Sequence, residues 1–262
     1  MSTATLTQFS ALGQVAVITL ANTPKRNVLS DAMIESILAG LEQARAIEAR
    51  CVILRAEPGV KVWSAGHDVA ELPESHRDPL GWSDPLRVVI RAIEEFPAPV
   101  VALVEGGVWG GACEMAFNCD LVVATPESTF AITPAKLGIP YNVSGLLTFM
   151  NVIPLHAVKE LIFTADPMGA PRAHELGAVN HVVPAGEITD FCLTLGRRIE
   201  SLAPLAIAVM KEELRVMASA HSITPRMFER VQGLRRHVYD SGDYQEGIRA
   251  FKEKRPAVFK GK

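Results

Sequence analysis

The middle of the chain holds a glycine-rich segment whose residue types suit binding of a developing negative charge. Residues 105–117 follow an apolar run at 99–104 and place four glycines ahead of a helix-like stretch. Glycines just before a helix N-terminus leave backbone N–H groups free for a ligand, and the partial positive charge there favours an oxyanion. Glu114 lies among apolar neighbours, where a carboxylate is costly unless it is paired or functional. The segment predicts an oxyanion-binding turn, with Glu114 in a site or in a structural pair.

Two shorter segments supply further candidate groups. In residues 62–68, small residues followed by Gly66 allow a tight turn that points the N–H of His67 towards a pocket. In residues 137–142, glycine and proline define a turn that presents Tyr141, whose phenol can orient a carboxylate through one hydrogen bond. Each segment by itself also fits an ordinary turn or a packed tyrosine, so the prediction depends on their combination.

Short β-rich runs and helical patterns alternate over the first 200 residues, which predicts an α/β architecture. The runs that suit buried strands are residues 15–20, 51–54, 99–104, 121–124 and 129–132. Apolar residues recur at helical spacing over residues 34–41, 86–93 and 188–202, and Ser30 is placed to cap the first of these helices. These elements must position the two glycine turns, because each turn follows a strand.

The last 60 residues have a different pattern. Helices are predicted over residues 204–220, 228–239 and 244–254, and no convincing strand follows Val183. Residues 222–262 hold ten Lys or Arg and five Asp or Glu, whereas the whole chain has a formal net charge of −3. This basic excess belongs either to solvated helix faces or to a segment that meets a phosphorylated ligand or another subunit. We predict a core over residues 1–200 and a C-terminal helical region over residues 201–262.

Composition and charge argue against several classes of protein. The 262 residues are 48% hydrophobic and 21% charged, which allows a sizeable core and excludes general disorder. The near-neutral charge argues against nucleic-acid binding, and no apolar run is long and uncharged enough for a membrane span. Four cysteines without a C-x-x-C pair predict buried thiols in a reducing compartment, the cytoplasm. Because metal-site, G-x-G-x-x-G and P-loop spacings are all missing, no cofactor or metal is expected.

Together these segments resemble the crotonase superfamily, also called the enoyl-CoA hydratase/isomerase family. The resemblance rests, in chain order, on residues 15–20, 24–29, 64–68, 106–114 and 119–122. It implies a spiral of β-β-α units with a C-terminal helical region that packs between subunits, and self-association as a trimer or hexamer. It also implies an acyl-CoA thioester substrate, whose carbonyl oxygen is bound by two backbone N–H groups that fall on His67 and Gly111.

The same resemblance implies the remaining substrate-binding residues. Those expected near the nucleotide part of CoA are Lys25, Arg26, Val28, Ala65 and Gly66, with Phe251 and Lys254 as candidates near the adenosine and 3′-phosphate. Trp109 is a candidate wall of an apolar acyl pocket, and Thr133 is a candidate polar contact. Asp68 and Gly110 complete the set, because they lie within the matching motifs.

One difference from the hydratases of this family changes which reaction is expected. Family hydratases use two glutamates; the first corresponds to Glu114, the second would fall near Pro134, and no carboxylate occupies residues 130–138. Because hydration needs a positioned acid–base pair, efficient hydration is not expected. The resemblance instead implies decarboxylation of methylmalonyl-CoA to propionyl-CoA, a reaction of this family. That reaction needs only two N–H groups for the enolate oxygen and Tyr141 for the departing carboxylate.

The predicted catalytic residues are therefore His67, Gly111 and Tyr141, with Glu114 near the site in a role left open. Two alternatives remain at this stage. One is hydratase or isomerase chemistry through Glu114 by itself, and the other is a non-catalytic acyl-CoA-binding protein that keeps the fold.

Overall fold

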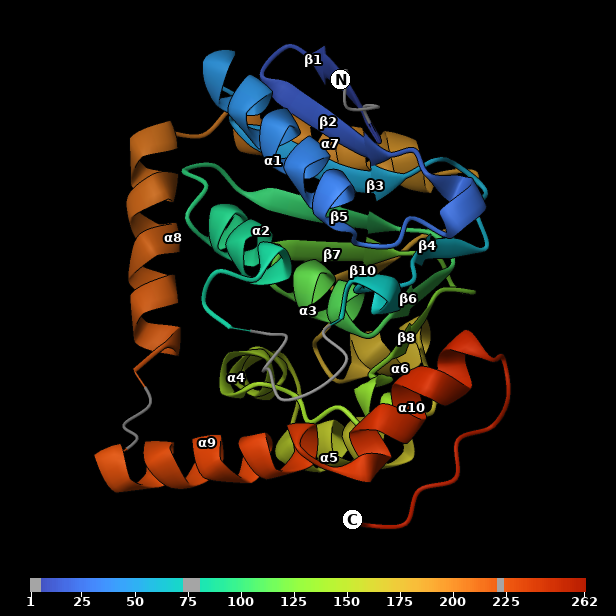
Figure 1. Ribbon diagram of the computed structural model, residues 1–262. Helices are drawn as coiled ribbons and strands as arrows, with labels where there is room; N and C mark the ends of the chain where they lie inside the picture. The colour runs from blue at the N-terminus through green and yellow to red at the C-terminus, as the bar shows by residue number, and fades with distance from the viewer. Residues whose placement is uncertain (1–5, 73–80, 221–223) are drawn as a thin grey trace.

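The computed structural model describes residues 6–72, 81–220 and 224–262, arranged around two sheets (Figure 1). The larger sheet has the strand order β1-β2-β3-β5-β7-β10, in which β1 is antiparallel to β2 and the other pairs are parallel. Its strands are β1 (Thr7–Leu12), β2 (Val15–Leu20), β3 (Cys51–Ala56), β5 (Val100–Val104), β7 (Leu121–Ala124) and β10 (His181–Val182).

A smaller sheet has the order β4-β6-β8-β9. Its strands are β4 (Val62–Ser64), β6 (Gly107–Trp109), β8 (Thr129–Ala131) and β9 (Met168–Gly169), of which the first three are parallel and the last pair is antiparallel. Because β4 and β6 run side by side in the same direction, their carboxyl ends meet. The two glycine turns that follow these strands are thereby brought together.

Three successive turns of the chain, which begin with β3, β5 and β7, each add one strand to each sheet and then helices, whereas β1 and β2 both lie in the larger sheet. After β1 and β2 come a short helix, η1 (Thr23–Lys25), and α1 (Asp31–Ala46); after β3 and β4 come η2 (Val69–Glu71) and α2 (Pro85–Glu94). β5 and β6 lead into α3 (Gly111–Phe117), and β7 and β8 lead into η3 (Pro134–Leu137), α4 (Val143–Val152) and α5 (Leu155–Thr164). α6 (Ala170–Glu175) follows β9, and α7 (Ile188–Glu200) follows β10. This is the predicted spiral.

Helices cover both faces of the larger sheet. On β3, Val52 and Leu54 pack with residues of α1 and α2, whereas Cys51 and Ile53 pack on the other face with residues of α7. This alternation follows from the two-residue period of a strand and explains why the whole of β3 is buried. All four cysteines are free and buried, as the sequence predicted.

Most predicted elements are confirmed, and their ends move by no more than five residues, the largest shift being at the end of α1. Strands 15–20 and 121–124 match their observed bounds, and Ser30 caps α1 by accepting a hydrogen bond from Met33 N at 3.3 Å. The glycine-rich segment was expected to turn directly into a helix, but Gly107–Trp109 first form β6. The indole of Trp109 folds over Gly107, where a Cβ would lie 2.7 Å from Nε1, so glycine is needed for this strand. β1 and helices α4 to α6 were not predicted.

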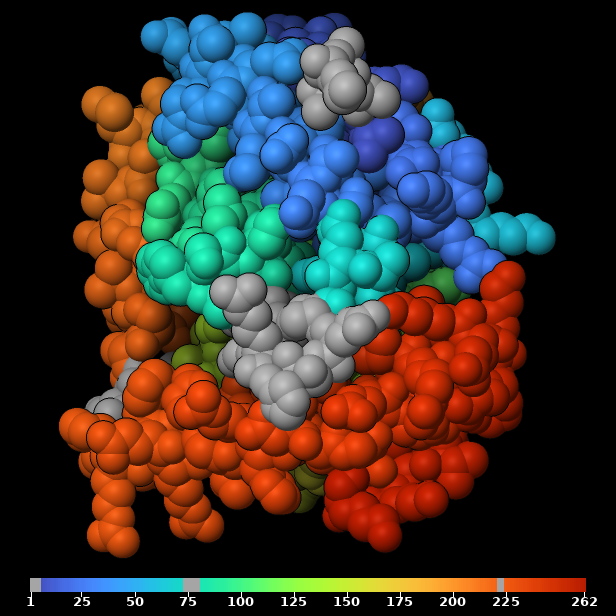
Figure 2. Space-filling view, in the orientation of Figure 1, coloured from blue at the N-terminus to red at the C-terminus, as the bar shows by residue number. Residues whose placement is uncertain are grey.

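Three helices form the described part of the C-terminal region: α8 (Pro204–Ala218), α9 (Pro225–Tyr239) and α10 (Gly242–Lys252). α8 stands along one side of the larger sheet, α9 runs beneath the molecule, and α10 returns towards η3 (Figures 1 and 2). Residues 201–220 and 224–262 contain no strand. Within the described ranges, no helix is both long enough and apolar enough to cross a membrane.

Candidate active site

A cavity of about 370 Å³ opens where the carboxyl ends of β4 and β6 face η3 and α10. The predicted site residues that line it are Arg26, Val28, Ala65, His67, Asp68, Trp109, Gly110, Gly111, Thr133, Tyr141 and Phe251. The cavity lining does not include Lys25, Gly66, Lys254 or Glu114. Lys136, which sequence reasoning did not single out, adds a second cation to the wall beside Arg26.

Two backbone N–H groups meet at this cavity. Gly66 has φ +82°, and a Cβ there would overlap the carbonyl oxygen of Trp109 and lie 3.0 Å from Gly111 N. A Cβ on Gly111 would lie 3.7 Å from His67 N. Neither of these two amides donates to a protein acceptor within the described ranges. Two neighbouring free donors suit a single oxygen that gains negative charge.

The loop after η1 is locked onto β4 by Asn27. The side chain of Asn27 is fully buried and donates from Nδ2 to Trp63 O at 3.0 Å, while Ser64 Oγ donates to Asn27 O at 2.7 Å. Ala65 N donates to Arg26 O at 2.9 Å. These bonds hold Arg26 and Val28 at the cavity, whereas Lys25 ends η1 with an exposed side chain.

Asp84 ties the His67 turn to the start of α2. Its Oδ1 accepts from Leu86 N at 2.9 Å as the N-cap of α2, and its Oδ2 lies 3.3 Å from His67 Nε2. His67 Nδ1 lies 3.2 Å from Asp68 O. Burial lowers the pKa of His67, but the hydrogen bond and charge of Asp84 outweigh it and the pKa is raised overall. Asp84 was missed from sequence, although an Asp-Pro pair ahead of an apolar helical pattern is a recognisable N-cap signal.

Glu114 lies behind the cavity wall in an ion pair. Its side chain is fully buried on α3 and is bound through Oε1 by Arg87 of α2, itself 9% exposed. Burial raises the pKa of Glu114 to about 7, and the Arg87 charge, which acts in the opposite direction, compensates only partly. The structural pair that the sequence predicted as one possibility for Glu114 is present, but Arg87 was not predicted as its partner.

Tyr141 meets the cavity with its ring, while its hydroxyl is buried. The ring packs edge-on against Phe149 with centroids 5.2 Å apart. A Cβ on Gly145 would overlap this ring and lie 2.8 Å from Glu114 Oε2, so the phenol and the carboxylate are neighbours. Burial raises the pKa of Tyr141 well above its ordinary value, and the Glu114 charge raises it further. No hydrogen bond of ordinary geometry joins the two groups.

Helix α9 holds the turn that carries Tyr141. Arg235 Nη1 donates to Tyr141 O at 2.6 Å and to Pro140 O at 3.2 Å, and Tyr239 OH donates to Pro140 O at 3.3 Å. The Arg235 and Tyr239 side chains are buried. Their spacing of four residues on one helix face was the available sequence signal, but nothing in it points to a partner almost 100 residues away.

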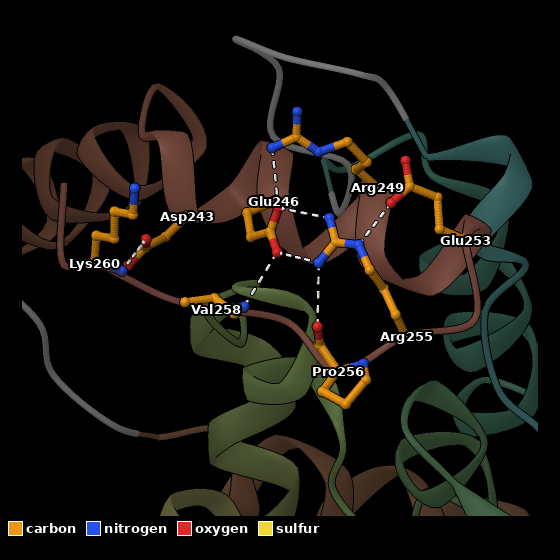
Figure 3. A network of polar contacts seen from close by, with 8 residues as sticks. All are labelled: Asp243, Glu246, Arg249, Glu253, Arg255, Pro256, Val258 and Lys260. Atoms are coloured by element: carbon orange, nitrogen blue, oxygen red, sulfur yellow. Dashed lines mark hydrogen bonds and ion pairs between the residues drawn. The ribbon is translucent and has the colours of Figure 1, made fainter.

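The C-terminal tail is bonded to the first half of α10 (Figure 3). The same helix carries Phe251, which lines the cavity. Glu246 accepts from Arg255 Nη1 at 2.6 Å, from Arg249 Nη2 at 2.9 Å and from Val258 N at 3.1 Å. These donors, Arg255 above all, lower the pKa of Glu246. Asp243 accepts from Lys260 N at 2.6 Å (Figure 3). Lys254 occupies the turn after α10 with φ +54° and lies outside the cavity wall.

The spiral of β-β-α units and this site define a crotonase-type protein. Residues 11–262 match the family described as enoyl-CoA hydratase/isomerase, and the chain belongs to that family. The predicted resemblance and the α/β crotonase fold are therefore confirmed.

The chain is also similar over nearly its whole length to individual proteins of known name. The chain is 50% identical to methylmalonyl-CoA decarboxylase of Escherichia coli (strain K12), over 95% of this chain and 96% of the relative. It is 33% identical to carnitinyl-CoA dehydratase of Salmonella paratyphi B, also over 95% of this chain and 96% of the relative. The structure matches that of methylmalonyl-CoA decarboxylase complexed with 2S-carboxypropyl-CoA with a TM-score of 0.97 and 49% identity, covering 100% of both chains.

Proposed function

We propose that this protein decarboxylates methylmalonyl-CoA to propionyl-CoA and CO2. The observation that carries the proposal is the meeting of two free backbone N–H groups with the ring of Tyr141 in one largely apolar cavity. The identity to methylmalonyl-CoA decarboxylase over nearly the whole chain supports the same reaction.

In the proposed reaction, the thioester oxygen accepts hydrogen bonds from His67 N and Gly111 N. The carboxylate stands perpendicular to the thioester plane, so that the breaking C–C bond overlaps the carbonyl π system. It is held by the Tyr141 hydroxyl, which has to turn from its buried position towards the cavity to reach it. Its electron pair passes into the thioester as CO2 leaves, and the resulting enolate takes one proton at C2 to give propionyl-CoA. Because the two donors bind the oxygen most strongly when it is charged, they stabilise the transition state more than the substrate. This route requires no cofactor beyond the CoA of the substrate.

The cavity walls support the proposed binding mode. Trp109, Leu86 and Ile139 give an apolar surface around the acyl group, which favours neutral CO2 over a charged carboxylate. At the outer part, Arg26 and Lys136 supply positive charge for the CoA phosphates, and Phe251 offers a ring for the adenine. Lys254 and Lys25 contribute charge from outside the lining. Thr133 Oγ1 would lie 3.2 Å from a Cβ on Gly110, and its hydroxyl is a second polar contact for the acyl part.

Hydration of an enoyl-CoA is the second candidate, and the match to carnitinyl-CoA dehydratase favours it. Two features of the site count against it. Glu114 is ion-paired with Arg87 behind the cavity wall, and Pro134 lines the cavity where the second carboxylate of hydratases was expected. Among the described lining residues, Asp68 is the one carboxylate, and it caps η2 by accepting from Ala70 N at 3.0 Å.

Mass spectrometry of the CoA esters tests the proposed reaction directly. The purified protein is incubated separately with methylmalonyl-CoA, malonyl-CoA and crotonyl-CoA, each against a protein-free blank. We expect rapid conversion of methylmalonyl-CoA to propionyl-CoA and slow or absent hydration of crotonyl-CoA. Unchanged methylmalonyl-CoA together with rapid water addition to crotonyl-CoA would establish the hydratase alternative. Tight CoA-ester binding without turnover would establish a non-catalytic binding protein.

We further propose that α8 and α9 pack against other copies of this chain, as a trimer or hexamer, in the cytoplasm. No residue of α8 is buried, and apolar side chains such as Leu205, Leu214 and Met217 are 81%, 67% and 73% exposed. An apolar helix face exposed to water over this length indicates a missing partner. α8 meets its own core through Lys211, whose Nζ bonds Asp120 Oδ2 at 2.6 Å and the carbonyls of Ile93 and Ala98 at 3.1 Å.

Charge placed on this apolar face should dissociate the assembly. Leu205→Asp combined with Leu214→Asp buries two carboxylates in the proposed contact, so we expect sedimentation velocity to show monomers where the unmodified protein shows trimers or hexamers. Glu213→Ala, an exposed change on the same helix, is the control and should leave the assembly intact. A monomeric unmodified protein at micromolar concentration would contradict the proposal.

A further inference from the structure

Two polar atoms without partners lie together beneath the cavity. Glu114 Oε2 and Tyr141 OH are fully buried, and neither has a hydrogen-bond partner of ordinary geometry in the described part of the chain, although each group shifts the pKa of the other. Buried polar atoms are nearly always paired, so a pair of orphans on neighbouring side chains needs an explanation. Both side chains surround the same glycine, Gly145, which leaves the space in which they can approach each other.

The charged groups around Glu114 determine whether its carboxyl group is ionised or neutral when substrate is bound. Arg87 faces it from α2 and occupies Oε1, Glu94 and the N-cap Asp84 add negative charge from the same side, and Tyr141 faces it from the turn before α4. A substrate carboxylate bound at the Tyr141 hydroxyl would bring another negative charge close to Glu114. Neighbouring carboxylates in a buried site do not both stay ionised, because the repulsion is poorly screened.

Resting on the proposed decarboxylation, we propose that Glu114 is a positioning residue that acts in its neutral form. Its Oε1 still accepts from Arg87, and its Oε2–H donates to the phenol oxygen of Tyr141. The phenol O–H is then free to turn towards the cavity and donate to the substrate carboxylate. An ionised Glu114 would accept the phenol hydrogen and turn it away from the substrate. No bond of the substrate is made or broken by Glu114, and its proton stays on the carboxyl group through the reaction.

The titration of Glu114 gives this arrangement a pH dependence. Its pKa is raised to about 7, mainly by burial, so the neutral form is abundant below pH 7 and is lost as the pH rises above it. We therefore expect kcat/KM for methylmalonyl-CoA to fall by about tenfold per pH unit on the alkaline side of that pKa, since one proton must be bound.

Three variants test whether Glu114 causes the fall in kcat/KM at alkaline pH, which is the alkaline limb of the pH profile. Glu114→Gln, whose amide donates at every pH, should lower the rate by about five- to tenfold but remove the limb. Tyr141→Phe should also remove the limb, because nothing remains for Glu114 to orient. Glu94→Gln is the matched control, since burial also raises the pKa of Glu94 and it faces the same Arg87, and it should keep the limb. Loss of the limb in Glu94→Gln, or its persistence in Glu114→Gln, overturns the proposal.

A binding measurement tests the same inference without turnover and without a variant. Calorimetry from pH 6 to pH 9 with 2S-carboxypropyl-CoA, in two buffers of different ionisation enthalpy at each pH, should show proton uptake that increases as the pH rises through the pKa of Glu114, because the ionised Glu114 becomes neutral when the ligand binds. Propionyl-CoA, which has no carboxylate, should cause no uptake. Equal heats in both buffers with the carboxylate ligand overturn the inference even if Glu114→Gln fails to fold.

The two proposals fail in different ways. If methylmalonyl-CoA gives no propionyl-CoA at any pH, the proposed decarboxylation is wrong, and the inference falls with it. If propionyl-CoA forms but the calorimetry shows no proton uptake, the reaction stands and the role of Glu114 is wrong.

Discussion

Tyr141→Phe should lower kcat for decarboxylation of methylmalonyl-CoA by about 10- to 100-fold, because a hydrogen bond to a charged group contributes about 1.5–3 kcal/mol. KM should change little, since most of the binding surface belongs to the CoA part. The fold should be retained, because the Tyr141 hydroxyl has no hydrogen-bond partner among the described residues and the ring contact with Phe149 is kept. Steady-state kinetics and thermal unfolding of the variant test both statements.

Tyr244→Phe provides the matched control for this variant. Tyr244 is fully buried in the cluster that joins α9 and α10 to η2 and η3, so loss of its hydroxyl should lower Tm and leave kcat nearly unchanged. A Tyr141→Phe rate within twofold of the unmodified protein would remove the phenol from the mechanism. A parallel loss of Tm in Tyr141→Phe would show that the residue acts through stability.

Gly66→Ala should reduce kcat/KM by about 100- to 1,000-fold, the usual effect of losing an oxyanion donor. Residue 66 has φ +82°, and an alanine Cβ would overlap Trp109 O and lie 3.0 Å from Gly111 N. The turn must therefore move, and the amides of His67 and Gly111 can no longer meet at one oxygen. The left-handed backbone adds a stability cost of about 1–3 kcal/mol.

Gly59→Ala distinguishes the two effects of Gly66→Ala, which are backbone strain and displacement of the two amides. Gly59 has a similar φ of +74°, but a Cβ there would have nothing within 4 Å. The Gly59→Ala variant should show a fall in Tm like that of Gly66→Ala, because both place alanine at a positive φ. Its catalytic rate should equal that of the unmodified protein. If both variants lose activity equally, backbone strain rather than the geometry of the two amides explains the loss in Gly66→Ala.

The candidate site is assembled mainly from helix ends that lie on different turns of the spiral. Asp84 at the start of α2 holds the His67 turn, Arg235 on α9 holds the carbonyls of the Tyr141 turn, and the tail beyond α10 fastens Phe251. None of these contacts involves the proposed reacting atoms; each holds a segment of the chain that lines the cavity. The position of a donor or phenol to within a fraction of an ångström depends on such supports.

The amino-acid sequence by itself determined the features that depend on residues close together in the chain. Runs such as 15–20 and 121–124 predicted their strands, because a largely aliphatic stretch of that length is typical of a buried strand in an α/β chain. Ser30 predicted the start of α1 through its cap. The missing carboxylate in residues 130–138 and the glycines at 66 and 110–111 are likewise local facts. Together with the other segments that carry the family resemblance, they indicate the family and the expected reaction.

Only the tertiary structure decided which side chains meet. The partner of Glu114 is Arg87, 27 residues earlier; the partner of His67 is Asp84; and the turn at Pro140 is held from 95 residues away by Arg235. The tertiary structure also placed Glu114 behind the cavity wall and the Tyr141 hydroxyl beside it. Periodicity and capping arise from residues within a turn or two of each other, whereas these contacts depend on how helices from separate turns of the spiral pack, for which the chain carries no local signal.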